Sequence, residues 1–124
     1  MAERILIVDD DPLMCNLLTL TLHREGYETD AVYSGQDALD YLSGRDVDLI
    51  LLDIMMADLN GIEVLRTLQT DPATATIPVI VLTARADAIT QQTGLDAGAV
   101  EYLTKPIAPD DLVERVRGVL AASA

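Results

Sequence analysis

Tryptophan and phenylalanine are absent from this sequence, and aromatic residues, all of them tyrosine, make up 3% of its 124 residues. Proteins that stack nucleic-acid bases or a flavin ring on aromatic side chains need more of them, so the sequence disfavours both functions. The chain has a single histidine, His23, and a single cysteine, Cys15. This pair cannot build a Cys/His zinc site, and a Ser-His-Asp triad is also disfavoured. Cys15 has no partner for an internal disulfide, which is typical of a protein in the reducing cytoplasm.

Basic residues are few, because 8 Lys and Arg stand against 21 Asp and Glu, and the net charge is −13. A chain with this charge repels the phosphate backbone of nucleic acids, so we expect no direct nucleic-acid binding. No apolar run reaches the roughly 20 residues that a membrane span requires, and the start "MAERILIV" lacks a secretory signal pattern. We therefore expect a single cytoplasmic domain over residues 1–124, without a membrane segment.

The chain does contain a regular alternation of apolar runs and amphipathic segments. The runs "VDLILL" and "IPVIVL" are almost continuously aliphatic, as in strands that are covered on both faces. Five β-α units in succession predict an α/β protein with a parallel sheet, helices on both faces and right-handed crossovers. We predict strands at 4–8, 28–33, 47–52, 77–82 and 100–104, and helices from Asp11, from Ser34, over about 60–70, over about 87–97 and from Pro109.

Helix-start signals agree with this alternation. Asp11 followed by Pro12 is the pattern of an N-cap residue with proline at the first helical position. Ser34 and Asp37 in "SGQD" have the spacing of a capping box. The acidic pair after Pro109 favours the N-terminus of the last helix.

Polar and charged side chains follow four of the five predicted strands. Asp9 and Asp10 follow the first strand, Asp53 the third, Thr83 the fourth and Lys105 the fifth. In an open parallel sheet these carboxyl ends lie at one edge, where ligands bind. Two carboxylates about 4 Å apart repel by about 4 kcal/mol at an effective dielectric constant of about 20. Three in one crevice would strain the fold or have raised pKa values unless a cation lies among them. Oxygen ligands open to water suit Mg²⁺, and the whole set suits phosphoryl transfer to an aspartate.

Each of these residues has an ordinary structural explanation when it is taken alone. An aspartate at a strand end is usually a turn or cap residue, a threonine is usually a helix cap, and a lysine is usually a solvated charge. For Tyr102, in the last predicted strand, packing in the core is as good an explanation as a chemical role. The coincidence of complementary groups at four strand ends is what favours a chemical role.

The chain resembles the receiver domain of two-component response regulators from residue 3 to about residue 120. The segments that carry the resemblance are "ILIVDDDP", "DLILLDIMMADLNGIEVL", "IPVIVLTA" and "GAVEYLTKPI". The resemblance implies a flavodoxin-like (βα)5 three-layer sandwich, with the five parallel strands in the order 2-1-3-4-5. It also implies a phosphorylation-controlled signalling switch and not an enzyme.

The resemblance implies a role for the clustered carboxylates. Asp53 would be the phosphoacceptor, forming an aspartyl phosphate with a phosphoryl group from a sensor histidine kinase or histidine phosphotransfer protein. Mg²⁺ would be held by Asp10, Asp53 and the main-chain carbonyl of Met55, with Asp9 acting through water.

Three further residues would complete the switch that the resemblance implies. Lys105, joined to Pro106 by a cis peptide bond, would bridge to the acceptor or to the phosphoryl group. Thr83 would move to bind a phosphoryl oxygen, and Tyr102 would swing inward behind it. These movements would change the surface of the fourth helix, fifth strand and fifth helix, which controls an effector or partner.

The sequence departs from the family pattern at several positions. Ala57 stands where the loop after the acceptor often has proline, so we expect a looser loop, and Ile107 replaces the usual phenylalanine after Lys-Pro. Receivers of the transcription-factor class often form dimers through interlocking charges on the surface of the fourth helix, fifth strand and fifth helix, which we call the switch surface. This chain has part of that set of charges, so a homodimer through the switch surface is an option. The charges present are Asp96, Glu101, Asp111 and Arg115, while Gln91 and Ala97 stand where charges are common.

Three other functions compete with that of a receiver domain. A Mg²⁺-dependent phosphatase of the haloacid-dehalogenase type also forms an aspartyl phosphate, but it needs a second aspartate two residues after the nucleophile, where this chain has Met55. A flavin mononucleotide carrier shares the fold, but "DDDPL" offers no phosphate cradle rich in Gly, Ser and Thr. A receiver-like interaction module without phosphorylation would have lost Asp10, Asp53 or Lys105, and this chain keeps all three. The chain is either a stand-alone receiver or a piece of a longer regulator or hybrid kinase.

Overall fold

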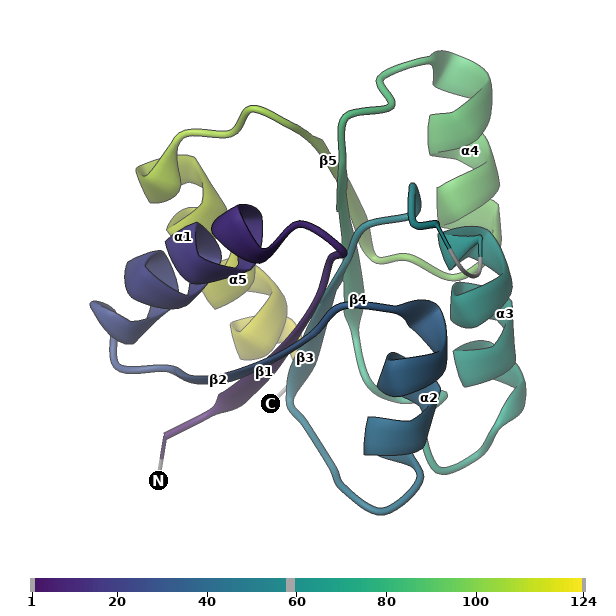
Figure 1. The fold of residues 1–124 in the computed structure, drawn as a ribbon, viewed down its shortest axis with the longest axis horizontal. Helices are drawn as coiled ribbons and strands as arrows, with labels where there is room; N and C mark the ends of the chain where they lie inside the picture. Colours follow the sequence, from purple (N-terminus) through teal and green to yellow (C-terminus); the bar gives the residue numbers. More distant parts are fainter. Residues whose placement is uncertain (1, 58–59, 124) are drawn as a thin grey trace.

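The computed structural model of the protein describes residues 2–57 and 60–123. Asp58 and Leu59, which belong to the motif around Asp53, lie outside the described residues. Along the described ranges, five strands alternate with five helices (Figure 1). Among these helices, none has both the length and the apolar character that crossing a membrane requires.

The observed elements agree closely with the predicted ones. The predicted strand at 77–82 begins at Val79 instead, because Pro78 has no N–H to donate to the sheet. The strands are β1 (Arg4–Val8), β2 (Glu28–Val32), β3 (Leu49–Leu52), β4 (Val79–Thr83) and β5 (Glu101–Thr104). The helices are α1 (Pro12–His23), α2 (Gly35–Leu42), α3 (Gly61–Thr70), α4 (Ala88–Asp96) and α5 (Pro109–Ser123).

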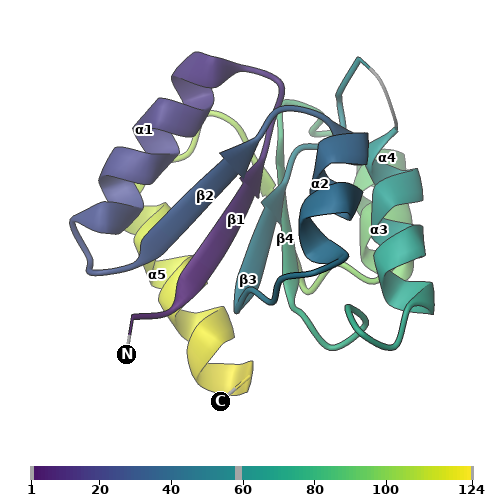
Figure 2. The same ribbon diagram turned by 60° about the horizontal axis from the view of Figure 1, so that its bottom comes forward.

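All five strands form one parallel sheet in the order β2-β1-β3-β4-β5, which confirms the predicted fold class. Figure 2 shows β2, β1, β3 and β4 side by side in this order. In register, Ile5 of β1 lies opposite Thr29 of β2 and Leu49 of β3, and Val81 of β4 lies opposite Tyr102 of β5. The chain passes from β1 to one edge of the sheet and then, through β3, to the other. The carboxyl ends of β1 and β3 therefore flank the point where strand order reverses.

Helices cover both faces of the sheet (Figure 1), with α1 and α5 on one face and α2, α3 and α4 on the other. Because successive side chains on a strand point to opposite faces, Ile5 and Ile7 pack toward α1 and α5, whereas Leu6 and Val8 pack toward α2 and α3. A strand buried on both sides is therefore aliphatic at most of its positions. This explains why β1, β3 and β4 appear in the sequence as unbroken apolar runs.

The predicted helix starts at Asp11 and Ser34 are confirmed. The Asp11 carboxylate accepts a hydrogen bond from the N–H of Leu13 at 3.0 Å, and the Ser34 hydroxyl accepts one from the N–H of Asp37 at 3.0 Å. Both bonds satisfy main-chain donors that have no partner inside the helix. Two further N-cap residues were not predicted, Asn60 for α3 and Asp87 for α4.

Candidate functional site at the carboxyl ends of the strands

The structure brings Asp9, Asp53 and Lys105 together at the carboxyl ends of β1, β3 and β5. Each residue directly follows its strand, and its main-chain N–H still donates to the neighbouring strand. The N···O distances are 3.2 Å from Asp9 to β2, 2.9 Å from Asp53 to β1 and 2.8 Å from Lys105 to β4. The sheet therefore fixes the backbone from which all three side chains project.

The side chain of Lys105 bridges the two carboxylates. Its Nζ donates to Asp9 Oδ2 at 2.7 Å and to Asp53 Oδ2 at 2.9 Å. Asp9 is 3% exposed and Asp53 is 7% exposed, so both charges lie largely out of water. Burial lowers the pKa of Lys105, but the hydrogen bonds to Asp9 and Asp53 outweigh it and hold this pKa above its ordinary value. Lys105 is therefore a cation at neutral pH, which is what two adjacent carboxylates require.

Main-chain amides hold the second oxygen of each carboxylate. Asp53 Oδ1 accepts a hydrogen bond from the N–H of Met55 at 2.9 Å, and Asp9 Oδ1 accepts one from the N–H of Asp11 at 3.0 Å. Both oxygens of Asp53 are thus positioned within the folded protein. A carboxylate oriented in advance loses less conformational freedom when it reacts. The Lys105–Pro106 peptide bond is cis, as the resemblance implies.

Asp10 lies on the exposed side of this cluster. Its Oδ2 accepts a hydrogen bond from the N–H of Ala57 at 3.2 Å, which ties the loop after Asp53 to the loop after β1. Proline, which the family often has at position 57, could not make this bond because it has no N–H. The substitution that we expected to loosen the loop therefore adds a hydrogen bond to it.

The donor chemistry of the site fits Mg²⁺, which prefers carboxylate and carbonyl oxygens. In residues 2–57 and 60–123, however, no group of three or more His, Cys, Asp or Glu side chains is arranged to hold a metal ion. Lys105 engages one oxygen each of Asp9 and Asp53, and the Ala57 N–H engages one of Asp10. A cation at this site would compete with these donors for the same oxygens.

Thr83 and Tyr102 both contact the loop that follows β4. Thr83 is 0% exposed, and its Oγ1 accepts a long hydrogen bond, 3.5 Å, from the N–H of Arg85. The Tyr102 hydroxyl donates to the carbonyl oxygen of Arg85 at 2.7 Å. Burial raises the pKa of Tyr102, so its hydroxyl remains a donor at neutral pH. Arg85 therefore joins the two predicted switch residues through its main chain, a role that the sequence analysis did not assign.

Gly61 is a second residue whose role the sequence analysis missed. It is the first residue of α3, and its N–H donates to the carbonyl oxygen of Ile54 at 3.2 Å. A Cβ atom at position 61 would lie 2.3 Å from the Ile54 Cα and 2.8 Å from the Asp53 carbonyl oxygen, which is too close for any side chain. Only glycine lets α3 begin against the backbone that carries the acceptor. The sequence shows a glycine at the start of a predicted helix, but it does not show which backbone segment lies against that glycine in the fold.

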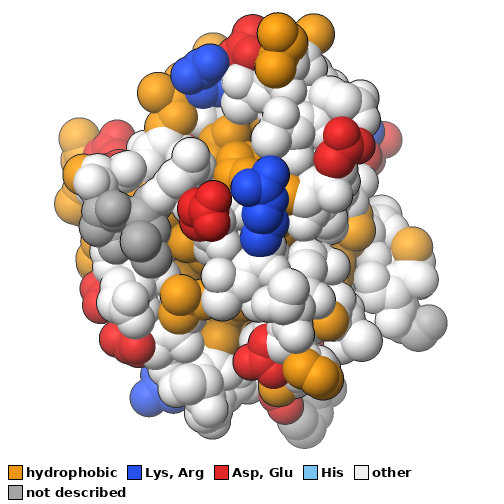
Figure 3. Space-filling model, turned by 90° about the vertical axis from the view of Figure 1, so that its right-hand side faces the viewer, with side chains coloured by type: hydrophobic (Ala, Val, Ile, Leu, Met, Phe, Trp, Pro, Cys, Tyr) orange, Lys and Arg blue, Asp and Glu red, His pale blue; other side chains and the backbone are white. Residues whose placement is uncertain are grey.

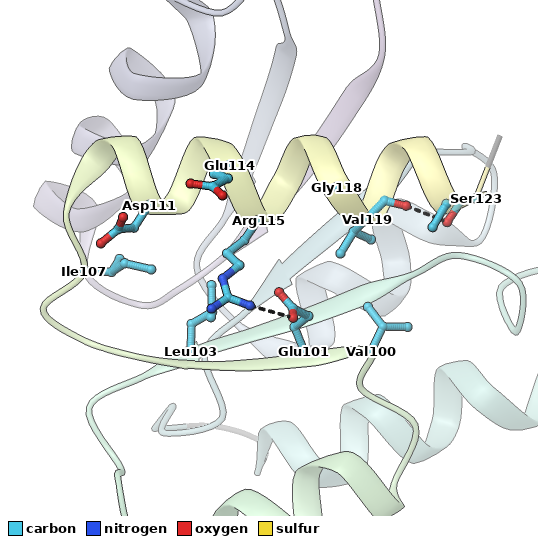
Figure 4. Close-up of a pocket in the computed structure, with 11 residues that line it drawn as sticks. Val100, Glu101, Leu103, Ile107, Asp111, Glu114, Arg115, Gly118, Val119 and Ser123 are labelled. Carbon is cyan, nitrogen blue, oxygen red and sulfur yellow. Dashed lines mark hydrogen bonds and ion pairs between the residues drawn. The ribbon is translucent and has the colours of Figure 1, made fainter.

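The predicted switch surface contains a groove of about 830 Å³ between β5 and α5 (Figure 4). Arg115 of α5 reaches across it to Glu101 of β5, with 3.1 Å between Nη1 and Oε1. These two charges of the predicted dimer set thus pair within one chain, while Asp111 and Ile107 also line the groove. On the adjacent side of the molecule, toward α3 and α4, acidic, basic and hydrophobic side chains are interspersed (Figure 3).

Comparison with known proteins gives consistent matches. Residues 5–117 match the family described as the response regulator receiver domain. The DNA-binding response regulator MtrA of Mycolicibacterium smegmatis is 42% identical over 120 residues, which are 97% of this chain and 51% of MtrA. The crystal structure of a CheY-like receiver domain protein from Methanospirillum hungatei has a TM-score of 0.93 at 30% identity, covering 99% of this chain and 97% of that one. A BeF3-activated DrrB receiver domain has a TM-score of 0.85 at 31% identity, covering 98% and 99%.

The chain spans about half the length of the curated relatives that it matches. Several of them are named DNA-binding response regulators, which contradicts our expectation of a protein that does not bind nucleic acid. The net charge of −13 misled us because it counts these 124 residues alone. Charge on the other half of such a protein does not enter that sum.

Proposed function

Because the chain belongs to the response regulator receiver domain family, we propose that Asp53 is the phosphoacceptor of a phosphorylation-controlled switch in a two-component system. The donor is a phosphohistidine on a sensor histidine kinase or a histidine phosphotransfer protein. The observation that carries this proposal is the contact of Lys105 with Asp53, 2.9 Å long, in a buried cluster at the strand ends. A cation held beside one oriented carboxylate is the arrangement that phosphoryl transfer to aspartate needs.

The transfer is a displacement at phosphorus. An oxygen of the Asp53 carboxylate forms a bond to phosphorus, and the bond from phosphorus to the donor's imidazole nitrogen breaks with its electron pair left on the imidazole. Lys105 stabilises negative charge on the acceptor and the phosphoryl oxygens, since it is already held in place by Asp9. The buried Thr83 hydroxyl donates to a phosphoryl oxygen once the loop after β4 shifts toward the site.

Asp10, Asp53, the Met55 carbonyl and, through water, Asp9 would hold Mg²⁺. Receiver domains bind this ion at the acidic phosphorylation site, and when bound it supplies positive charge to the transferring oxygens. For the ion to bind, the donors that now hold oxygens of Asp10 and Asp53 must give way. The Ala57 N–H must release Asp10, and Lys105 must share Asp53 with the ion and the phosphoryl group.

The switch output is the surface of α4, β5 and α5. Tyr102 belongs to β5 and hydrogen bonds to the loop that follows Thr83, so a shift of that loop changes the position of the Tyr102 side chain. The groove between β5 and α5 lies on the same surface and gives an effector a site of contact (Figure 4). In a longer protein like its named relatives, we infer that this surface controls DNA binding.

The protein is a cytoplasmic switch and not an enzyme that turns over a separate substrate. The alternative, an aspartyl-phosphate phosphatase, lacks support, because the residue two positions after Asp53 is Met55, whose side chain carries no acid. The alternative of a module without phosphorylation is disfavoured by the retained contacts of Asp53 with Lys105 and with the N–H of Met55.

Beryllofluoride, which mimics an acyl phosphate, tests this function by NMR. With Mg²⁺ present, it should shift the amide resonances of Thr83 and Tyr102 in the wild-type protein and in a control, Asp110→Asn, at the exposed start of α5. Asp53→Asn should abolish these shifts. Shifts that persist in Asp53→Asn, or a wild-type protein that does not respond, would refute Asp53 as the acceptor.

A further inference from the structure

Helix α4 contains an interior glycine, Gly94, that helix formation does not explain. Glycine is the poorest helix former apart from proline, because it loses the most backbone freedom when the helix forms. Among the described residues of α4, Gly94 is nonetheless the one that is buried. The interior helix glycine to compare with it is Gly118 in α5, where an added Cβ would meet no atom of the described residues within 4 Å, apart from nearby backbone of α5 itself.

The space beside Gly94 is occupied by the ring of Tyr102. A Cβ atom at position 94 would lie 3.1 Å from Tyr102 Cδ2 and 3.2 Å from Tyr102 Cε2. These separations are shorter than ordinary carbon–carbon contacts, so the ring would have to move by a few tenths of an ångström. The next neighbour, Ile62 Cδ1, would lie at 3.9 Å, which is an ordinary contact. Among the neighbours that the structure describes within 4 Å, the Tyr102 ring alone lies closer than an ordinary contact.

The same ring is held at its other end by the loop after β4. Its hydroxyl donates to the carbonyl oxygen of Arg85 at 2.7 Å, two residues beyond Thr83. The Tyr102 ring therefore extends from Gly94 in α4 to the loop that follows Thr83. A displacement at the Gly94 end changes the geometry of the hydrogen bond at the Arg85 end, because the ring is rigid.

We propose that Gly94 is a positioning residue, which lets the Tyr102 ring lie against α4 while its hydroxyl is bound to Arg85. This rests on the proposed function, because it concerns how a change at Asp53 reaches the surface of α4, β5 and α5. With a methyl group at position 94, the ring is displaced, its bond to Arg85 weakens, and movement of Thr83 is no longer passed to α4.

Thermal unfolding of matched variants tests the steric part of the proposal. Gly118→Ala should raise the melting temperature by about 2–5 °C, the gain expected when alanine replaces glycine in an exposed helix. Gly94→Ala should give no such rise while Tyr102 is present. In a Tyr102→Ala background, Gly94→Ala should raise the melting temperature about as much as Gly118→Ala does. Equal rises at positions 94 and 118 with Tyr102 present, or no rise at 94 after the ring is removed, would overturn the proposal.

NMR with Mg²⁺ and beryllofluoride tests whether Gly94 positions Tyr102 for the switch. If Gly94 had only a structural role, its substitution would not change the response of α4 to beryllofluoride. In Gly94→Ala, the response at Thr83 should persist, whereas the Tyr102 ring and the α4 amides should respond less than they do in Gly118→Ala. An undiminished response of α4 in Gly94→Ala would contradict the role. If the wild-type protein does not respond at all, the proposed function fails, and the melting comparison alone then decides whether Gly94 accommodates Tyr102.

Discussion

At the scale of single residues, Lys105 is the centre of the site. Its ammonium group is the counter-charge of two buried carboxylates, and both distances are those of short charge-assisted hydrogen bonds. In Lys105→Ala, Asp9 and Asp53 keep their places at the strand ends but lose the cation between them.

We therefore expect Lys105→Ala to lower the free energy of unfolding by about 1–3 kcal/mol without Mg²⁺, since two close carboxylates are left without their cation. Added Mg²⁺ should stabilise this variant more than the wild type, because the ion no longer competes with the ammonium group. Urea unfolding at several Mg²⁺ concentrations measures both effects. A variant as stable as the wild type that gains no more from Mg²⁺ would contradict this account of Lys105.

Cys15 gives a prediction about pH. It is 1% exposed, its thiol donates to the carbonyl oxygen of Asp9 at 3.4 Å, and burial followed by the nearby Asp9 charge raises its pKa from 9.0 to about 11. Between pH 9 and pH 11 the unfolded chain releases the thiol proton while the folded protein keeps it. The free energy of unfolding should therefore decline as pH rises through this window.

The control for this effect is Cys15→Ser, whose hydroxyl does not ionise in this range. Its stability should decline less steeply between pH 9 and pH 11 than that of the wild type, and the two profiles should run parallel below pH 9. Other groups that titrate at alkaline pH, such as Lys105, are common to both proteins. If the free energies of unfolding of the two proteins ran parallel over the whole pH range, the fold would not raise the pKa of the Cys15 thiol.

At the scale of elements, α3 begins close against the backbone of Asp53 and Ile54, in the acceptor loop that follows β3. Gly61→Ala places a Cβ within 2.3 Å of the Ile54 Cα, so the helix start and the loop must separate. We expect a loss of about 3 kcal/mol in the free energy of unfolding, together with weaker Mg²⁺ binding, because Met55 lies in the displaced loop. Isothermal titration calorimetry and urea unfolding measure the two effects.

The matched control is Gly44→Ala, at a position where an added Cβ would meet no other part of the described structure within 4 Å, apart from its two chain neighbours. Its stability should change by no more than about 0.5 kcal/mol. If Gly61→Ala behaved like Gly44→Ala, the close approach of α3 to the acceptor loop would not be a constraint.

Much of the element structure could be predicted from the sequence because its signals are local. Asp11 with Pro12 and Ser34 with Asp37 cap helices through residues two or three positions away, and aliphatic runs identify strands buried on both faces. Strand order came from the family resemblance, since pattern alone does not fix it.

The features that escaped prediction depend on contacts between distant segments. Gly61 is constrained by the backbone of Ile54, and Gly94 by the ring of Tyr102, neither of which is marked in the local sequence. The same holds for Ala57, whose N–H donates to Asp10 in a different loop, a hydrogen bond that the local sequence does not mark.

At the scale of the whole molecule, one topological fact assembles the site. Because every strand is parallel, all strand ends lie at one edge, and the reversal of order at β1 places Asp9 beside Asp53. Tyr102 lies in β5 at the far edge of the sheet, and Lys105, 52 residues after Asp53, directly follows β5. β5 therefore connects the Lys105 contact with Asp53 to the surface of α4, β5 and α5. A change of charge at the acceptor is therefore linked to an exposed face of the protein.

The central claim is that Asp53 carries the phosphoryl group, and intact-mass spectrometry tests it most directly. Incubation with a small phosphodonor and Mg²⁺ should add one phosphoryl group to the wild type and to Asp110→Asn, and hydroxylamine should remove it, as expected for an acyl phosphate. Asp53→Asn should gain no such label, and a chelator should prevent labelling of the wild type. A hydroxylamine-sensitive label that persists in Asp53→Asn would contradict the account.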